Sequence, residues 1–274
     1  MTIMAGMGSP TGTGVGPLLL GWRERRQLSQ QHLALRADCS ARHLSFVENG
    51  RSHPSRELVL RLVEQLDVPV RERNTLLLAA GYAPHYPETP LDDPSMDPLR
   101  GGIERLLAVH DPYPALVVDG DFRVLAANRA LVLLLDGVAP HLLRPPSNAV
   151  RIALHPDGLA PRIVNHRQWR GHLLERLDQQ LERVGTEQLR RLREEVGGYP
   201  EPAGAPAEDP AETGRPVALP LRLRHDGRVL SFLSTVTTFG TPLDVTVSEL
   251  ALETFLPADA GTDRFLRSAV GPDR

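Results

Sequence analysis

One short part of this 274-residue chain has a clear excess of positive charge. Residues 18–63 contain eight arginines against four acidic residues, a local balance of +4 in a chain whose formal net charge is −3. Guanidinium groups pair with phosphates and with base edges, so this segment could bind nucleic acid although the whole chain is slightly acidic. The alternative is that these arginines form only the solvated face of a helical module.

A second set of polar side chains, at residues 148–155, has helical spacing. Asn148, Arg151 and His155 recur at intervals of three and four, so one helix face could present an amide, a guanidinium and an imidazole together. Such a face could hold a carboxylate head group. In the alternative interpretation, Arg151 and His155 only tie the helix to the HPDG turn that follows. Trp169 would form the floor of a pocket or simply pack.

Other chemistries have little support in the sequence. His155, Asp157 and His166 have the types of metal ligands but no tight ligand spacing, so no metal site is predicted. We find no GxSxG motif, no P-loop and no GxGxxG after a strand, and therefore predict no enzyme. The absence of a signal peptide, of paired cysteines and of a run of roughly 18 apolar residues leads us to expect a cytoplasmic protein without a membrane partner.

The order of helical and strand patterns predicts two domains. After a disordered lead (1–16), residues 17–83 have the pattern of an all-α module of about five helices. Residues 84–98, with five prolines and four acids, are a linker. Residues 99–270 are an α+β domain with a flexible loop at 197–216.

Within the α+β domain, strands are predicted in 114–128, 220–239 and 245–255, with an Asp-Gly turn in each of the first two segments. Helices are predicted around 100–110, at 128–135 and as one long helix from about 165 to 196. This order predicts a mixed sheet with helices on one face enclosing a cavity, a PAS-like arrangement.

The arginine-rich segment contains two short helices joined by a tight break. Ser29 and Ser40 precede the helical runs and are expected to cap them. Asp38 falls in the break, where it tolerates a left-handed backbone. With Leu44 and Val47 buried, the start of the second helix presents four side chains outward: Ala41, Arg42, Ser45 and Phe46.

This segment resembles the helix-turn-helix of the phage-repressor-like (Xre) regulators without a gap. The resemblance rests on Gln30, Leu33-Ala34, Ser40, Leu44 and the run Val47-Glu48-Asn49-Gly50. It departs from the family at Asp38, where Gly is usual.

The resemblance implies that the second helix lies in the major groove of double-stranded DNA, with its first residues against base edges. The implied base contacts are Ala41, Arg42, Ser45 and Phe46. The implied phosphate contacts are Gln30, Ser40, Asn49 and Arg51. Arg42 would be the main base contact, because its planar fork can pair with O6 and N7 of guanine.

Most of the remaining chain resembles the MmyB-like group of Xre regulators, found mainly in actinobacteria. The strings that carry this are GYAP (81–84), PALVVDGDFRVLAANRA, SNAVRIALHPDGLAPRIVNHRQWRGHL and TFGTPLDVTVSELALETFLPAD. The resemblance implies a PAS-like ligand-binding domain whose small apolar ligand, such as a fatty acid, sets operator affinity. Asn148, Arg151, His155 and Trp169 are the candidate ligand contacts, and no other cofactor is expected.

We therefore expect a homodimeric, ligand-modulated transcription regulator, since one reading unit spans only a half-site. The alternative is a protein-binding sensor whose helical module is a docking surface and not a DNA reader.

Overall fold

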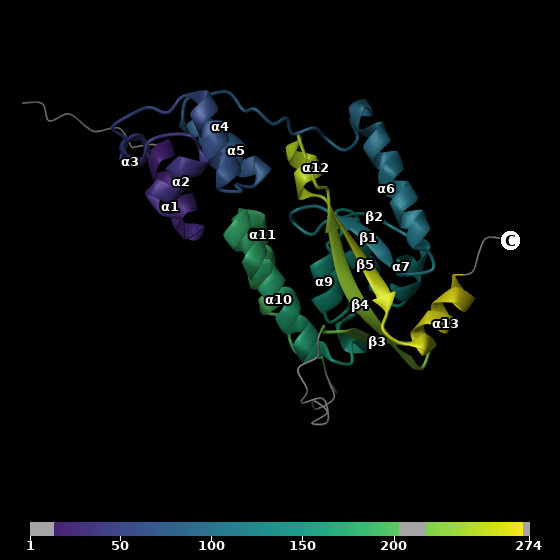
Figure 1. The fold of residues 1–274 in the computed structure, drawn as a ribbon. Coiled ribbons are helices and arrows are strands. Elements are labelled where there is room, and N and C mark those ends of the chain that lie inside the picture. The colour runs from purple at the N-terminus through teal and green to yellow at the C-terminus, as the bar shows by residue number, and fades with distance from the viewer. Residues whose placement is uncertain (1–13, 203–217, 271–274) are drawn as a thin grey trace, which may run out of the picture. The chain divides into compact units, whose positions relative to one another are not determined.

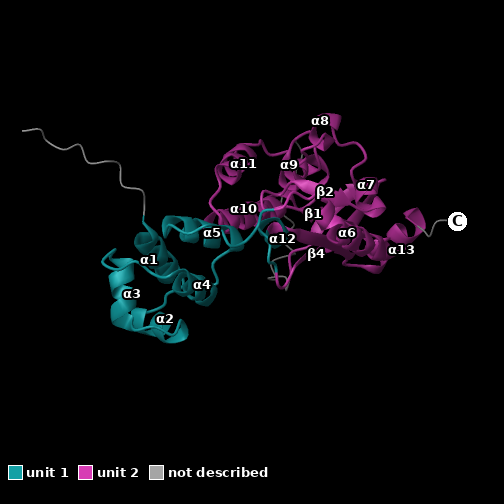
Figure 2. Ribbon diagram, turned by 90° about the horizontal axis from the view of Figure 1, so that it is seen from above, with its two compact units in different colours: residues 1–88, 242–248 teal, residues 89–241, 249–274 magenta. Residues whose placement is uncertain are grey.

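We describe the protein from a computed structural model, which covers residues 14–202 and 218–270 (Figure 1). The chain divides into two compact units (Figure 2). The first unit contains the chain up to residue 88 together with residues 242–248, and the second contains residues 89–241 and the chain from residue 249. Residues 1–13 of the predicted disordered lead (1–16) lie outside the described residues. The first helix begins at Val15.

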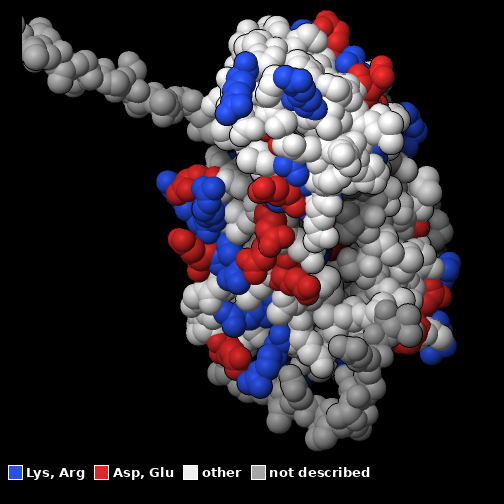
Figure 3. All heavy atoms as spheres, turned by 60° about the vertical axis from the view of Figure 1, so that its left-hand side comes forward, with Lys and Arg blue, Asp and Glu red and all other residues white. Residues whose placement is uncertain are grey.

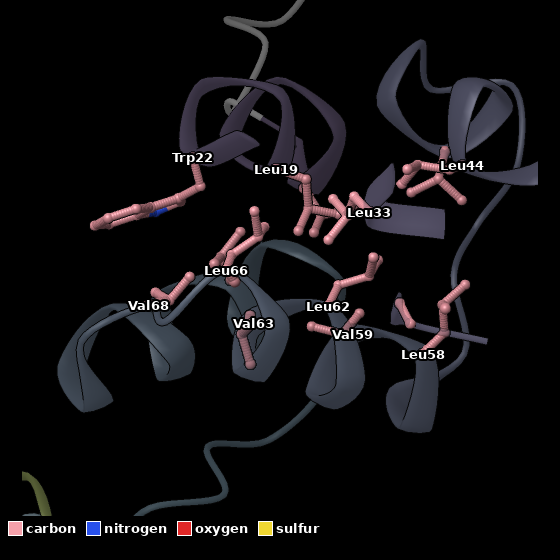
Figure 4. Packing of buried hydrophobic residues seen from close by; sticks show 14 of the residues in the cluster. Leu19, Trp22, Leu33, Leu44, Leu58, Val59, Leu62, Val63, Leu66 and Val68 are labelled. Atoms are coloured by element: carbon pink, nitrogen blue, oxygen red, sulfur yellow. The ribbon is translucent and has the colours of Figure 1, made fainter. Parts of the chain in front are cut away.

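The N-terminal part of the first unit is all-helical, as predicted. Its helices are α1 (Val15–Arg25), α2 (Gln30–Arg36), α3 (Ala41–Glu48), α4 (Arg56–Gln65) and α5 (Val70–Ala79). Leu19 of α1, Leu33 of α2 and Leu44 of α3 are fully buried against α4 residues such as Leu62 (Figure 4). Apolar residues at helical spacing on each helix thus build one core, which fixes α2 and α3 relative to each other.

Helices α1 and α3 approach each other closely at Gly16. A Cβ atom built on Gly16 would lie 2.5 Å from the carbonyl oxygens of both Val47 and Glu48. Since real Cβ atoms do not come this close to an oxygen, only glycine fits between these backbones. The contact places the last turn of α3 directly against the first turn of α1.

The second unit is built on an antiparallel sheet. Its described strands are β1 (Ala115–Val118), β2 (Val124–Ala127), β3 (Leu221–His225), β4 (Arg228–Thr238) and β5 (Ala251–Pro257), arranged in the order β2-β1-β5-β4-β3. Asp226 and Gly227 both have positive φ, which is the backbone of the tight Asp-Gly hairpin predicted between β3 and β4.

Helices cover both faces of this sheet. They are α6 (Asp97–His110), α7 (Arg129–Leu134), α8 (Pro140–Leu143), α9 (Ala149–Leu154), α10 (His166–Arg183), α11 (Glu187–Gly197) and α13 (Ala260–Ala269), with single 3₁₀ turns η1 (Pro94–Met96) and η2 (Ala160–Arg162). Leu107 of α6 packs with Val117 and Leu252 on one face, while α9 and α10 lie over the face that carries Leu116. The PAS-like α+β class is confirmed, but the prediction of helices on one face only was wrong.

Three further predictions for the α+β domain were wrong in detail. The sheet is not mixed, since every described strand pair is antiparallel. The predicted long helix breaks between α10 and α11, where Gly185 has φ +68° and the Thr186 side chain caps α11 by accepting from the Leu189 amide. A helix, α12 (Val245–Glu249), replaces the first half of the predicted third strand, because Asp244 accepts from the Thr246 amide and starts a helical turn.

Candidate nucleic-acid interface and ligand cavity

The turn between α2 and α3 has the capped geometry that the sequence predicted. The Ser29 hydroxyl accepts from the His32 amide and the Ser40 hydroxyl from the His43 amide, each at 3.1 Å. Asp38 between the two helices has φ +50°, in the left-handed region. Two short helices with ordinary N-caps and one left-handed residue therefore make the tight turn, and Asp38 takes the backbone position for which glycine is better suited.

The first residues of α3 face outward to different degrees. Arg42 is exposed, whereas Ala41, Ser45 and Phe46 are half-buried. The guanidinium carbon of Arg42 lies 5.4 Å from the centroid of the Phe46 ring. This cation–π contact holds a planar fork of hydrogen-bond donors above an apolar ring on one side of the helix.

Most arginines around these helices are held by hydrogen bonds within the first unit. Arg26 donates to the carbonyl of Leu66, Arg36 to the side chain of Gln65, and Arg61 to the carbonyl of Ala37. Arg23, Arg25 and Arg56 also have partners, in Glu48, the Gly21 carbonyl and His85.

Two arginines differ from these, and they lie at the two ends of α3. Within the described residues, the side chains of Arg42 and Arg51 form no hydrogen bond or ion pair, and both residues are exposed. Every basic group in Figure 3 is an arginine, because the chain has no lysine, and on the face shown arginines and acids are interspersed. Among the described residues of the first unit, the positive charges that remain available to a phosphate or a base are thus those near the two ends of α3.

The other predicted phosphate contacts have local hydrogen-bond partners. Gln30 donates through Nε2 to Glu48 Oε2 at 2.7 Å, and Asn49 donates through Nδ2 to the Ser45 carbonyl at 2.8 Å. Ser40 uses its hydroxyl as the α3 cap. The phosphate roles of Gln30, Ser40 and Asn49 stay predictions.

A buried charge network that the sequence reasoning missed joins α1, α2 and α3. Glu48 is 5% exposed. Its carboxylate accepts hydrogen bonds from Arg23 Nε at 2.7 Å and Arg23 Nη2 at 3.0 Å, in addition to the one from Gln30. The hydrogen bond to Glu48 raises the pKa of Arg23. The signal was present in the sequence, since Glu48 falls four residues after the buried Leu44 and must therefore share its face.

A cavity of about 580 Å³ lies between the sheet and helices α7, α9 and α10 of the second unit. Its volume is within the range of roughly 300–1,000 Å³ that small-molecule sites occupy. Its apolar wall includes Leu116, Val124, Leu131, Val132, Leu135, Ala149, Val150, Ile152, Ala153, Leu159, Ile163, Trp169, Leu173, Leu221 and Phe255. The cavity is thus suited to a mainly apolar molecule.

One corner of the cavity is charged. Arg176 of α10 donates through Nη1 to Glu253 Oε1 of β5 at 2.8 Å, and Ser234 of β4 donates to the same oxygen at 2.9 Å. The side chains of Arg176 and Glu253 are 20% and 8% exposed. The sequence reasoning did not single out these two residues, which are 77 positions apart in the chain.

Comparison with protein-family models assigns both units. Residues 99–269 match the MmyB-like transcription regulator ligand binding domain, which is more than half of the chain. The chain belongs to the MmyB-like transcription regulators. Residues 16–76 of this MmyB-like regulator match a helix-turn-helix domain, so the two units combine a DNA-binding domain with a ligand-binding domain.

Other comparisons add little to the family assignment. The crystal structure of the clp gene regulator ClgR from Corynebacterium glutamicum is 25% identical over 35% of this chain and 84% of that one, with a TM-score of 0.22. An RNA-binding light-oxygen-voltage receptor is 15% identical over 93% of this chain and 60% of that one, with a TM-score of 0.24. At these TM-scores neither structure gives information about the fold or the function of the MmyB-like regulator. No curated protein matches the chain.

The predicted ligand contacts of the MmyB-like regulator occupy different surroundings. Trp169 lines the cavity. Asn148 caps α9 by accepting from the amides of Val150 and Arg151, and Arg151 forms a bidentate ion pair with Glu195 of α11, with both distances 2.7 Å. Asn148 and Arg151 thus have internal partners, and their role as ligand contacts stays a prediction.

His155 follows the end of α9, and the centroid of its ring lies 5.0 Å from the centroid of the Tyr199 ring. The structure brings His155 and Asp157 together with His141, and not with His166, with candidate ligand atoms within 4.8 Å of one another. The Asp157 amide donates to His155 Nδ1 at 2.9 Å, which occupies one of the two ring nitrogens. A ligand-binding role of His155 also stays a prediction.

None of the helices in the described part of the chain is both long and apolar enough to cross a membrane.

Proposed function

We propose that this MmyB-like regulator reads a specific operator with α3, and that a small apolar molecule in the cavity of the second unit sets its affinity for that operator. The DNA part of the proposal is supported by two arginines, Arg42 and Arg51, near the two ends of the N-capped α3. Among the described residues, neither side chain has a hydrogen-bond or ion-pair partner. The other arginines around α3 serve the fold of the unit, so these two have the freedom that DNA contacts require.

Arg42 is the proposed base-reading residue, with Ala41, Ser45 and Phe46 beside it. Its fork can donate two hydrogen bonds to guanine O6 and N7, and the Phe46 ring beneath it can touch a thymine methyl group. Arg51 is proposed to bind a phosphate, together with Gln30, Ser40 and Asn49. Base contacts specify the sequence, whereas phosphate contacts fix the register of the helix on the duplex.

A homodimer is part of the proposal. One helix-turn-helix unit covers a single half-site, and two half-sites about one helical turn apart supply the affinity of a specific complex. A ligand that favours one arrangement of the two reading units would shift operator affinity, and a coupling of about 1–3 kcal/mol is enough for regulation.

The effector is proposed to be an apolar molecule of the fatty-acid class or similar, lying along Trp169 and the aliphatic wall of the cavity. Chain connectivity offers a route for coupling. Residues 242–248 belong to the first unit, yet they connect β4 to β5, and β5 carries the cavity residues Glu253 and Phe255. A ligand that displaces β5 would therefore act on a segment of the DNA-binding unit.

Binding to the DNA that flanks the protein's own gene tests this proposal. Fluorescence anisotropy should show specific, salt-sensitive binding that Arg42→Ala weakens about 5- to 150-fold, the equivalent of about 1–3 kcal/mol, with reduced discrimination at one base pair. Arg51→Ala should weaken binding to all sequences and reduce the salt slope by about one. Arg25→Ala is the matched control, because Arg25 is exposed on α1 and bonds within its own helix.

The protein-docking alternative predicts a different outcome. Wild-type protein would then bind flanking DNA no better than random DNA, with or without extracted lipid, and Arg42→Ala would behave like Arg25→Ala. That result would refute the operator-reading role of α3.

A further inference from the structure

The charged corner of the cavity presents both hydrogen-bond donors and acceptors. A guanidinium carries five N–H donors. Within the described residues, the hydrogen bond of Arg176 goes from Nη1 to Glu253 Oε1, and its guanidinium carbon lies 5.6 Å from the centroid of the Phe122 ring. The other nitrogens of the fork have no hydrogen-bond acceptor among these residues. Glu253 accepts its two hydrogen bonds on Oε1, from Arg176 and Ser234, so Oε2 keeps its acceptor capacity among these residues. Both side chains line the cavity, which places unused donors and an unused acceptor at its wall.

The two charges of this corner balance each other. The positive Arg176 and the negative Glu253 are 2.8 Å apart. Burial lowers the pKa of His172, one turn before Arg176 on α10, and Arg176 lowers it further, so both favour the neutral form of the imidazole. Glu175 on α10 and Asp136 at the cavity wall are not buried and are therefore screened by water.

A charged ligand head would meet a like charge in this corner. A carboxylate that bound Arg176 would lie against the carboxylate of Glu253, and an ammonium group that bound Glu253 would lie against Arg176. Either ion would also lose its hydration on entering a mainly apolar cavity, which is costly unless the charge is fully paired. A neutral group that accepts from the free nitrogens of Arg176 and donates to Glu253 Oε2 meets neither penalty.

We propose that the polar end of the effector is an uncharged group that both accepts and donates a hydrogen bond, such as a primary amide or a hydroxyl, and that it binds between Arg176 and Glu253 with its apolar tail along Trp169 and Phe255. The inference rests on the proposed function in that it takes this cavity as the effector site. It makes an ionised fatty acid a weaker ligand than the corresponding amide.

Three probes with the same apolar chain test the inference: decanamide, decanol and decanoate. Their dissociation constants for the full-length protein at neutral pH are measured by isothermal titration calorimetry. We expect wild-type protein to bind decanamide at least ~10-fold more tightly than decanoate, because a like charge at a few ångströms in a partly buried site repels by an amount of this order or more. Decanol should also bind more tightly than decanoate.

Glu253→Gln reverses the expected order. The substitution keeps the shape of the side chain and removes the negative charge, so decanoate can pair with Arg176 and should bind more tightly than decanamide. Ser234→Ala is the matched control, because it removes the hydrogen bond to Glu253 Oε1 without a change in charge and should leave the wild-type order intact. Far-UV circular dichroism checks that each variant is folded, and the wild-type ranking decides the question even where a variant is not.

The possible results separate the inference from the proposed function. If decanoate binds wild-type protein as tightly as decanamide or more tightly, or if folded Glu253→Gln keeps the wild-type order, the neutral-head inference is wrong while the effector site stands. If none of the three probes binds wild-type protein, the cavity is not an effector site for amphiphiles, and both the effector part of the proposed function and the inference fail.

Discussion

The network around Glu48 leads to a quantitative prediction for the DNA-binding unit. Glu48→Gln keeps the size of the side chain but replaces one carboxylate oxygen by an amide group that can only donate. The carboxylate accepts from Arg23 Nε at 2.7 Å, Arg23 Nη2 at 3.0 Å and Gln30 Nε2 at 2.7 Å. At least one of these donors must lose its acceptor, and the charge of Arg23 loses its counter-ion.

The size of the effect follows from burial. The Arg23 and Glu48 side chains are 12% and 2% exposed, so water screens their interaction little. A hydrogen bond to a charged group contributes about 1.5–3 kcal/mol, and removal of one partner of a buried pair costs about 3–5 kcal/mol. Because the amide that replaces the carboxylate would retain one acceptor oxygen, we expect the first unit to lose about 3 kcal/mol, or about 12–24 °C in its melting temperature.

Fluorine NMR of protein labelled with fluorotryptophan measures this loss in the full chain. The chain has two tryptophans, Trp22 buried in the first unit and Trp169 buried in the second. The fluorine resonance of each tryptophan therefore reports the thermal unfolding of its own unit. Glu48→Gln should shift only the Trp22 transition. Glu64→Gln, the same change at an exposed position of α4, is the control. Equal shifts of the Trp22 transition in both variants would refute the reasoning from burial.

Two further predictions concern the packing of α1 and the contacts of α11. Gly16→Ala should destabilise the first unit by about 1–3 kcal/mol, since its Cβ would lie 2.5 Å from two carbonyl oxygens of α3. The unfolding is again followed on the Trp22 resonance. Gly21→Ala, where the nearest atom is 3.8 Å away, should instead stabilise α1 by about 0.5–1 kcal/mol, and equal effects at both glycines would contradict the close approach. Burial and the hydrogen bond to Glu195 raise the pKa of Tyr199 to about 12, so this phenol should be among the last of the chain's four tyrosines to ionise in an ultraviolet titration. Its contribution to stability is complete below pH 10 and is lost as the pH rises toward 12. Tyr199→Phe should remove this late ionisation, and a loss of amplitude near pH 10 in its place would show that Tyr199 ionises normally.

Features set by neighbouring residues could be predicted from the sequence. Ser29 and Ser40 cap their helices, and Asp38 takes the left-handed backbone of the break, because each depends on hydrogen bonds and torsions within a few residues. The Asp226-Gly227 hairpin was predictable for the same reason. These local features are enough to place α3 and its outward side chains.

Features set by distant residues were predicted less well. The β-branched run Val245-Thr246-Val247 indicated a strand, but the Val245 amide donates to the Pro87 carbonyl and the residue is buried, so contacts outside the run override its β-propensity. Arg176 and Glu253 looked like ordinary charged positions of a helix and a strand. Only the packing of α10 over β5 joins them into the polar corner of the cavity.

One measurement tests the central claim, that a molecule in the cavity sets operator affinity. The dissociation constant for flanking DNA is measured by anisotropy with and without a saturating amount of the probe that binds wild-type protein most tightly. Ala153→Phe, which fills the cavity from α9, is the control. We predict that the probe changes the wild-type constant about 5- to 150-fold, in line with the usual range of allosteric coupling, and leaves that of Ala153→Phe unchanged. An identical wild-type constant with and without saturating probe would contradict the account.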